Sequence, residues 1–379
     1  SGHSLLAHML DVAAVAEAII YRESIASQLW VADVFGLPRD TTPRWLAAMT
    51  GLHDFGKAIP GFQVKWLIGQ QIDQTAGLPF TPNVALRADR HDLASAILLR
   101  SEFIRRFPGT TWALAVSQAL GAHHGYFPSP TELQGSNAKP VFERLEWSMA
   151  RSQLFDAYFE TLRPYAPPIH IELPLPAVAW LAGLTSVADW IGSNQDWFPP
   201  GERADLLTEH YAKACELAEK ALDDIGWPHH RLLLQDKADT NTLIARILGR
   251  DRAQARPLQL SAGRLLDRTS GPALMIVEAP MGEGKTELAF LAHLRLQARN
   301  GHRGLYVALP TQATGNAMFN RALTFLRGFA PDVRLDIQLA HGGAMLDDRV
   351  HRLRGINQSK AESVGCSAWF SQRKRPLLS

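Results

Sequence analysis

The spacing of apolar residues changes near residue 228, and this change constrains the fold more than any other feature of the sequence. Before it, apolar residues recur every three or four positions, which is the repeat of an amphipathic α-helix. After it, short apolar runs alternate with helical segments, as in a parallel sheet covered by helices. We therefore expect an all-α domain over residues 1–230, a linker region over 231–270, and an incomplete α/β domain over 271–379.

Local patterns place the expected elements. In the first part the helical repeat is clearest over five segments: 5–20, 94–103, 112–120, 142–158 and 178–191. The polar, proline-rich stretch 127–140 is predicted to be a surface loop. In the second part we expect strands at 273–278, 304–309 and 335–339, with helices at 286–299 and 311–327.

Composition excludes several classes of protein. With 46% hydrophobic and 20% charged residues among 379, the chain can bury a core and is not predominantly disordered. A net charge of +2 excludes a polybasic nucleic-acid binder. Two distant cysteines, Cys215 and Cys366, indicate neither a disulfide framework nor a cysteine zinc site. Because the sequence has no long apolar run and no signal-peptide pattern, we expect a soluble, cytoplasmic protein without a membrane partner.

Histidines and aspartates, residue types that can ligate metals, interrupt or end the apolar helical segments of the first part. The pair His53-Asp54 is a sensible unit for two cations, since one carboxylate can offer an oxygen to each, and Gly56 is expected to end its helix. Taken alone, the pair has an ordinary structural explanation, a buried histidine beside a capping aspartate. Other polar residues in similar positions strengthen the metal interpretation. Without a metal, each of them would need its own buried hydrogen-bond partner, whereas two cations would satisfy them together. The full set is His8, His53, Asp54, His91, His123, His124 and Asp189.

Four short motifs carry a resemblance to a known family. They are HDFGKA at 53–58, RHDLASA at 90–96, GAHHG at 121–125 and ADWIGS at 188–193. Together they resemble the all-α HD superfamily of metal-dependent phosphohydrolases, and in particular the nuclease domain of the CRISPR-associated HD nuclease-helicases of type I systems. The resemblance spans roughly the first 195 residues.

The resemblance implies a two-metal site. One metal would be held by His8, His53, Asp54 and Asp189, and the other by Asp54, His91, His123 and His124. Lys57 and Ser193 would contact the substrate phosphate, with Asp54 and Lys57 as the catalytic residues. Asp92 stands where the family usually has Glu and is expected to pair with an imidazole or to cap its helix. Histidine-rich ligation favours Mn, Fe, Co, Ni or Zn over Mg.

A phosphate-binding loop, APMGEGKT at 279–286, lies between an expected strand and an expected helix. Gly282 and Gly284 let backbone amides face a phosphate, Lys285 reaches the terminal phosphates of ATP, and Thr286 offers a hydroxyl to Mg. Around the loop, Gln259 resembles a helicase Q-motif that reads adenine, and Thr311 lies in a segment resembling helicase motif Ia, which contacts nucleic acid. The expected fold is therefore RecA-like.

No DExH or DEAD box follows the loop in this sequence, so we expect weak ATP binding and poor hydrolysis by a segment of a longer protein. The resemblance implies a single-stranded DNA nuclease coupled to an ATP-dependent 3′-to-5′ helicase that degrades invading DNA, recruited by the Cascade surveillance complex with its CRISPR RNA. Two alternatives stay open. One is an HD nucleotide phosphohydrolase fused to an unrelated ATPase, and the other is an ATP-gated nucleic-acid-binding module.

Overall fold

The computed structural model describes residues 4–81, 90–136, 144–168, 172–201, 203–309 and 312–331. Within these ranges the chain forms two compact units, one made of residues 4–21 and 28–223 and the other of residues 22–27 and 224–331. The expected third strand at 335–339 and Cys366 lie outside the described residues.

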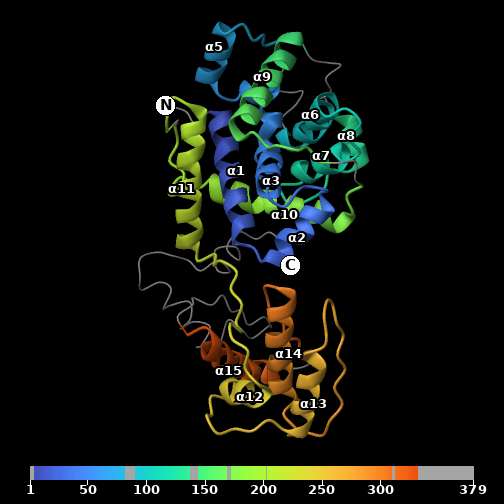
Figure 1. Cartoon of the computed structure of the whole chain (residues 1–379). Coiled ribbons are helices and arrows are strands. Elements are labelled where there is room, and N and C mark those ends of the chain that lie inside the picture. The colour runs from blue at the N-terminus through green and yellow to red at the C-terminus, as the bar shows by residue number, and fades with distance from the viewer. Residues whose placement is uncertain are drawn as a thin grey trace. The chain divides into compact units, whose positions relative to one another are not determined.

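The first unit is helical throughout its described part, which confirms the prediction from the apolar repeat (Figure 1). Its elements are α1 (Leu5–Arg22), α2 (Ile25–Val34), α3 (Thr42–Gly51), the 3-10 helix η1 (Leu52–Lys57), α4 (Pro60–Gln63), α5 (Leu67–Thr75), α6 (His91–Arg106), α7 (Ala113–Gly121), α8 (Pro130–Gly135), α9 (Leu145–Leu162), α10 (Leu175–Gly192) and α11 (Leu207–Ile225).

Three helices, α1, α3 and α10, lie at the centre of this unit, while α11 runs beside α1 and α6 to α8 cover the opposite side (Figure 1). The central helices are rich in small apolar residues, and nearly every residue of α1 from Ala7 to Ile20 is buried. Small side chains allow helices to approach closely, which positions their polar residues with little freedom. Helix α10 has the length and apolar composition of a membrane span, and 67% of that span is buried in the protein.

Two glycines fix how α6 packs against its neighbours. A Cβ atom at Gly56 would lie 2.1 Å from the His91 backbone oxygen, and one at Gly121 would lie 2.8 Å from the Ala96 Cβ. Only glycine allows these approaches. The expectation that Gly56 ends a helix is wrong, because η1 continues to Lys57. The residue is needed for close packing, not for termination.

The stretch 127–136, predicted as loop, contains the short helix α8. Its start is fixed by a capping box in which the Ser129 hydroxyl accepts from the Glu132 amide and the Glu132 carboxylate accepts from the Ser129 amide. The sequence SPTE carries this signal, which the abundance of proline and polar residues obscured.

The second unit contains α12 (Thr240–Leu248), α13 (Pro257–Leu266), α14 (Lys285–Asn300) and α15 (Gln312–Phe329). Apolar residues of α12, α14 and α15 form its core, and the rings of Phe290 and Phe325 stack with centroids 4.5 Å apart. The expected helices at 286–299 and 311–327 thus correspond to α14 and α15.

No strand is formed at 273–278 or 304–309, so the strand predictions are wrong for the described residues of this unit. Their apolar side chains are uncovered, with Leu274 89% exposed and Tyr306 90% exposed. A strand exists only through hydrogen bonds to neighbouring strands, and an apolar run without such neighbours gains nothing from the extended pairing geometry. The regular secondary structure in the described part of the second unit is therefore helix alone, joined by irregular segments.

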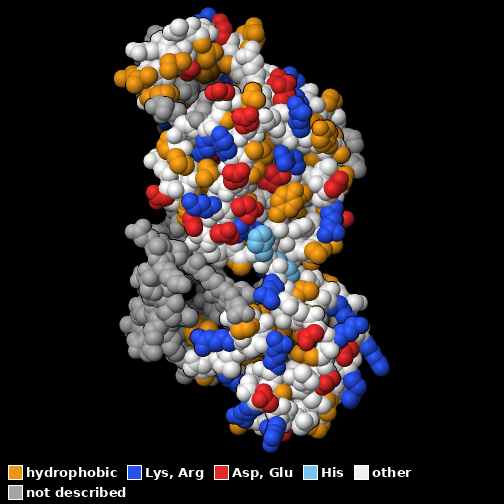
Figure 2. All heavy atoms as spheres, turned by 60° about the vertical axis from the view of Figure 1, so that its left-hand side comes forward, with side chains coloured by type: hydrophobic (Ala, Val, Ile, Leu, Met, Phe, Trp, Pro, Cys, Tyr) orange, Lys and Arg blue, Asp and Glu red, His pale blue; other side chains and the backbone are white. Residues whose placement is uncertain are grey.

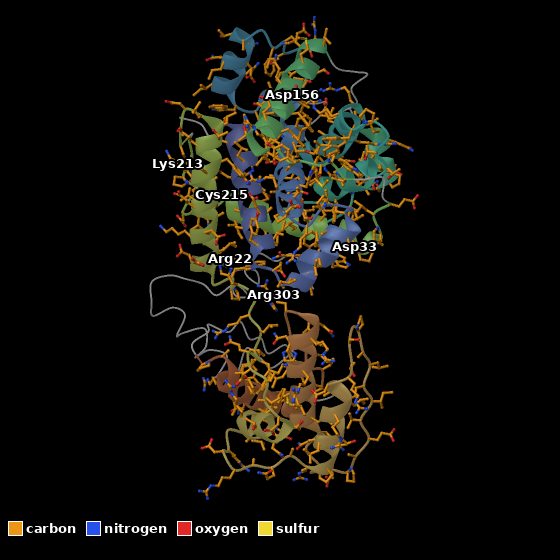
Figure 3. All side chains as sticks on the ribbon, in the orientation of Figure 1. Arg22, Asp33, Asp156, Lys213, Cys215 and Arg303 are labelled. Carbon is orange, nitrogen blue, oxygen red and sulfur yellow. The ribbon has the colours of Figure 1, made fainter. Side chains whose placement is uncertain are left out.

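Cys215 lies on α11 (Figure 3) and is a half-buried free thiol. Burial and the nearby Glu17 carboxylate raise the pKa of Cys215 to about 11. A thiol with so high a pKa is a poor nucleophile and a poor metal ligand at neutral pH. This agrees with the interpretation of Cys215 as an unreactive residue.

Candidate metal centre

Five structural elements bring together the seven residues singled out in the sequence. The residues are His8 on α1, His53 and Asp54 on η1, His91 at the first position of α6, His123 and His124 just after α7, and Asp189 near the end of α10. They lie in a partly enclosed site, with His53 0% and Asp54 2% exposed. Burial of so many polar groups needs strong compensation.

The Oδ2 atom of Asp54 faces the first of two clusters. It lies 3.1 Å from His8 Nε2 and 3.4 Å from His53 Nε2. Asp189 Oδ1 completes the cluster, 3.7 Å from His8 Nε2 and 3.3 Å from His53 Nε2. Donor atoms bound to one ion at about 2.1 Å lie roughly 3–3.5 Å apart, so the spacing fits a single cation.

The Oδ1 atom of Asp54 faces the second cluster. It lies 3.3 Å from His91 Nε2 and 3.9 Å from His123 Nε2. The Nε2 atom of His124 lies 3.0 Å from that of His91, and the ligand atoms of these three histidines all fall within 4.8 Å of one another. Asp54 thus presents one oxygen to each cluster, the arrangement of a bridging carboxylate.

Buried imidazole nitrogens without hydrogen bonds show that the donor sets suit cations. Among the described residues, His53 Nε2 and His123 Nε2 have no hydrogen-bond partner, although both lie near the carboxylates. The Nδ1 atom of His123 faces the Leu120 carbonyl oxygen at 2.7 Å, which fixes the ring with Nε2 as its free lone pair. A cation in each cluster would satisfy the nitrogen of that cluster.

The pKa values describe the electrostatics of the two clusters. Burial lowers the pKa of His123 to about 3 and that of His91 to about 4, so both rings are neutral at pH 7 and able to ligate a metal. Burial also acts to lower the pKa of His53, but the carboxylates of Asp54 and Asp189 outweigh it and raise that pKa to about 10. A cation would take the place of the His53 proton between the two carboxylates.

The carboxylates respond in the opposite direction. Burial alone would raise the pKa of Asp54, but His53, His8 and Lys57 hold it well below its usual value. The pKa of Asp189 is lowered by His53 in the same way. Both carboxylates are therefore ionised over the physiological range, as metal ligands must be.

Lys57 and Ser193 lie at the edge of this site, on the wall of a cavity of about 620 Å³ that also reaches His8. The Lys57 ammonium group forms an ion pair with Asp54 Oδ2. The Ser193 hydroxyl donates to Asp189 Oδ1 at 2.8 Å, so in this structure it orients a carboxylate. Both side chains are placed where a substrate entering the cavity would meet them.

Asp92, in the first turn of α6, pairs mainly with Arg90, with smaller contributions from the Leu93 amide at the start of the helix and from His91. It accepts from Arg90 at 3.1 Å through Oδ1 and at 2.5 Å through Oδ2, and the same guanidinium donates to Glu132 Oε1 at 3.0 Å. The pairing lowers the pKa of Asp92 despite its burial. Arg90 thereby ties the start of α6, which carries His91, to α8.

A buried clasp, made of Asp11, Arg203 and His210, holds α1 and lies outside every motif found in the sequence. Arg203 donates to Asp11 Oδ1 at 2.5 Å and to Oδ2 at 2.9 Å, and Asp11 is 0% exposed. The Nε2 atom of His210, on α11, lies 3.2 Å from Asp11 Oδ1. Asp11 lies three residues after His8 on α1, so the clasp fixes the helix that supplies a cluster residue. Only an odd buried charge in an apolar helix could have indicated it.

Two serines near the clusters also support the site. The Ser95 hydroxyl accepts from the Gly56 amide at 2.8 Å, which holds η1 to α6. The Ser186 hydroxyl donates to the His123 carbonyl oxygen at 2.7 Å, which holds the chain after α7 to α10. Ser95 lies within the RHDLASA motif, so its position in that motif was the available signal.

The phosphate loop of the second unit has the backbone that its glycines predict. Gly282 and Gly284 have φ values of 85° and 76°, and α14 begins directly afterwards at Lys285. The Lys285 ammonium group donates to the carbonyl oxygens of Ala279 and Pro280, at 2.5 and 2.8 Å. Thr286 accepts from Arg321 Nη1 at 3.1 Å.

Gln259 braces this loop. Its Oε1 accepts from the Arg256 amide at 2.9 Å, its Nε2 donates to the Gly284 carbonyl oxygen at 3.1 Å, and the residue is 2% exposed. Since both ends of the amide already pair with the backbone, its contact with adenine stays a prediction. Thr311 lies outside the described residues.

Comparison with known proteins identifies relatives along the whole chain. The chain is 38% identical over 387 residues to the CRISPR-associated endonuclease/helicase Cas3 of Thermus thermophilus, covering 99% of this chain and 41% of that protein. It is 26% identical over 415 residues to the protein of the same name from Escherichia coli K12, covering 99% and 44%. The chain thus spans about two fifths of the length of these relatives.

Comparison with solved structures identifies relatives of the same kind. A crystal structure of T. fusca Cas3 with ADP has a TM-score of 0.72 at 26% identity, covering 91% of this chain and 38% of that chain. A chain of a CRISPR RNA-guided surveillance complex in a pre-nicking state has a TM-score of 0.61 at 27% identity, covering 84% and 36%. The family model described as the HD domain of Cas3 matches residues 1–198, and this chain therefore belongs to the Cas3 HD family.

Proposed function

We propose that this chain is a two-metal, metal-dependent nuclease that cleaves single-stranded DNA as an endonuclease and exonuclease, joined to the beginning of an ATP-dependent 3′-to-5′ helicase of type I CRISPR interference. The observation that carries the proposal is the carboxylate of Asp54, with each oxygen facing a separate cluster of buried imidazoles. Family membership supports a role in CRISPR defence, since the relatives are named as Cas3 nuclease-helicases.

The residues present suit two divalent transition metals. His8, His53 and Asp189 would hold one ion and His91, His123 and His124 the other, with Asp54 shared between them. Five imidazoles and two carboxylates favour Mn, Fe, Co, Ni or Zn. When bound, such a pair of ions supplies a nucleophile from water at neutral pH and neutralises charge on a phosphodiester.

The chain's own residues would position the DNA. Lys57 lies on the cavity wall beside Asp54, so its ammonium group would contact the phosphate undergoing cleavage and stabilise its added charge. Ser193 keeps Asp189 oriented and offers its hydroxyl to a second phosphate oxygen. No protein nucleophile is required, since water would supply the attacking oxygen.

The second unit would bind ATP with Mg as part of a RecA-like helicase domain. Gly282, Gly284, Lys285 and Thr286 would hold the phosphates and the Mg ion, with Gln259 near the adenine and Thr311 on the DNA. Residues 224–379 carry 22 Lys and Arg against 13 Asp and Glu, whereas residues 1–223 carry 17 against 24. Figure 2 shows this contrast, with Lys and Arg prominent over the second unit. Such a charge excess favours DNA backbone binding there.

The implied partner is the Cascade surveillance complex with its CRISPR RNA, since a chain of an RNA-guided surveillance complex is similar to this one. A cytoplasmic location goes with that partner.

The test is cleavage of circular single-stranded DNA by the full 379-residue chain, with Mn²⁺ or Ni²⁺ and with or without a chelator. We expect metal-dependent nicking of the circle that is lost in Asp54→Ala and kept in the control Asp33→Ala, because Asp33 is exposed on α2. Lys285→Ala should cleave as wild type, since the chemistry at the clusters needs no ATP. Release of phosphate from dNTPs with intact circles would instead indicate a nucleotide phosphohydrolase.

A further inference from the structure

We propose that the cavity beside the clusters contains a base-binding subsite in which Trp66 stacks on the base of a nucleotide whose phosphate faces Lys57. The inference rests on the proposed nuclease function and adds to it how the strand is gripped. The proposed ligand of the aromatic residues in the cavity is a nucleobase.

The wall of the cavity contains two chemically different groups of residues. His8, Lys57 and Ser193 belong to the clusters or lie beside them, and four aromatic residues also line the cavity: Phe62, Trp66, Trp147 and Phe198. A volume of about 620 Å³ falls within the usual range for pockets that bind small ligands. A nucleotide likewise combines a charged phosphate with a flat, apolar base, which would match these two groups of residues.

Trp66 is fixed yet open to a ligand. It precedes α5, and a Cβ atom at Gly69 would lie 2.2 Å from Trp66 Cε3, so the indole lies against the helix where glycine leaves room. The residue nevertheless keeps 49% of its surface exposed. A large aromatic ring held rigidly with open surface is a platform for base stacking. Hydrophobic side chains gather at the end of the first unit that carries α5 (Figures 1 and 2).

Trp147 and Phe198 form part of the wall of the cavity and are not free to stack. Trp147 and Phe198 are each 3% exposed, and the Trp147 indole donates to the Pro79 carbonyl oxygen at 2.8 Å. Trp147 therefore has a fixed orientation. Of the two tryptophans that line the cavity, Trp66 is therefore the one with surface available to a base.

Two lysines place positive charge beside Phe62, which lines the same cavity as Trp66. The Nζ atoms of Lys57 and Lys65 lie 5.6 and 4.8 Å from the centroid of the Phe62 ring. Cations next to an exposed aromatic ring are the usual combination in grooves that bind single strands, where the cations contact phosphates and the rings contact bases. The same pattern would not favour a purely apolar peptide, which offers no anion to these lysines.

The experiment measures steady-state cleavage in Mn²⁺ of a single-stranded oligonucleotide of about 12 nucleotides by the full chain. Trp66→Ala should raise KM about tenfold with kcat nearly unchanged, and Trp66→Phe should restore most of the loss because a ring remains. Trp30→Ala is the matched control, since Trp30 is 40% exposed and does not line the cavity. Oligonucleotides carrying abasic sites should abolish the difference between wild type and Trp66→Ala.

The outcomes separate this inference from the nuclease proposal. If wild type cleaves and Trp66→Ala has the KM of Trp30→Ala, or if abasic sites leave the difference intact, the subsite is refuted and the nuclease stands. If wild type does not cleave, the nuclease proposal fails, and fluorescence anisotropy with the labelled oligonucleotide decides the subsite. Binding about tenfold weaker in Trp66→Ala would support it, and equal affinity or no binding would overturn it.

Discussion

Replacing Arg203 by Met should destabilise the first unit strongly, because it removes the cation that faces a fully buried carboxylate. Asp11 is 0% exposed, and the Arg203 side chain is 13% exposed. Breaking a buried ion pair costs about 3–5 kcal/mol. Since His210 Nε2 stays 3.2 Å from Asp11 Oδ1, we expect the lower end, about 3 kcal/mol.

Urea unfolding of the full chain, followed by tryptophan fluorescence, measures this loss, because eight of the ten tryptophans lie in residues 1–223. Arg100→Met, on an exposed position of α6, is the control and should change the unfolding free energy by less than about 0.5 kcal/mol. Combining Arg203→Met with Asp11→Leu should recover much of the stability, since the buried carboxylate is removed together with the guanidinium that paired with it. A loss below about 1 kcal/mol in Arg203→Met, or no recovery in the double variant, would refute this account of the clasp.

Three further predictions concern other parts of the chain. Gly56→Ala should cost about 1–3 kcal/mol in a urea titration, because its Cβ atom would lie 2.1 Å from the His91 backbone oxygen. Mn²⁺ or Ni²⁺ at about a hundred times its Kd should stabilise wild type by about 2.7 kcal/mol in thermal unfolding, reversibly with chelator and not in Asp54→Ala. Burial, with a smaller effect of His302, lowers the pKa of His293 from 6.5 to about 4. At His293 the unfolded chain therefore binds a proton more tightly than the folded chain does. The part of the folding stability that depends on a neutral His293 is complete above about pH 6.5 and is lost as the pH falls toward 4. An acid titration of His293→Gln beside wild type should show a weaker dependence, and equal curves would contradict the assignment.

Six of the seven residues of the candidate metal centre, all but His8, were predictable because they lie in short motifs. HDFGKA and GAHHG each fix two polar residues at adjacent positions, so a pattern of a few letters carries the chemistry without knowledge of the packing. The clasp was not predictable, because Arg203 and Asp11 are 192 positions apart and neither belongs to a motif. Contacts of that kind depend on how helices pack, which periodicity does not reveal.

The second part shows the converse difficulty. The apolar run at 273–278 has the composition of a buried strand, yet it forms none among the described residues. Strand pairing is decided by neighbours distant in sequence, whereas the ends of α12 and α14 follow local signals such as Asp239 before α12 and Gly301 after α14. Helices in this chain were therefore predicted more reliably than strands.

The 3-10 winding of η1 has a consequence for how sequences of this family can vary. In such a helix, side chains three positions apart eclipse one another, and this alignment sets the Lys57 ammonium group on the Asp54 carboxylate. Adding or deleting one residue between them would turn the amine away by about a third of a revolution. A substitution at position 55 keeps this alignment, whereas an insertion or deletion between Asp54 and Lys57 destroys it. Among homologues, gaps in this turn should therefore be rarer than substitutions.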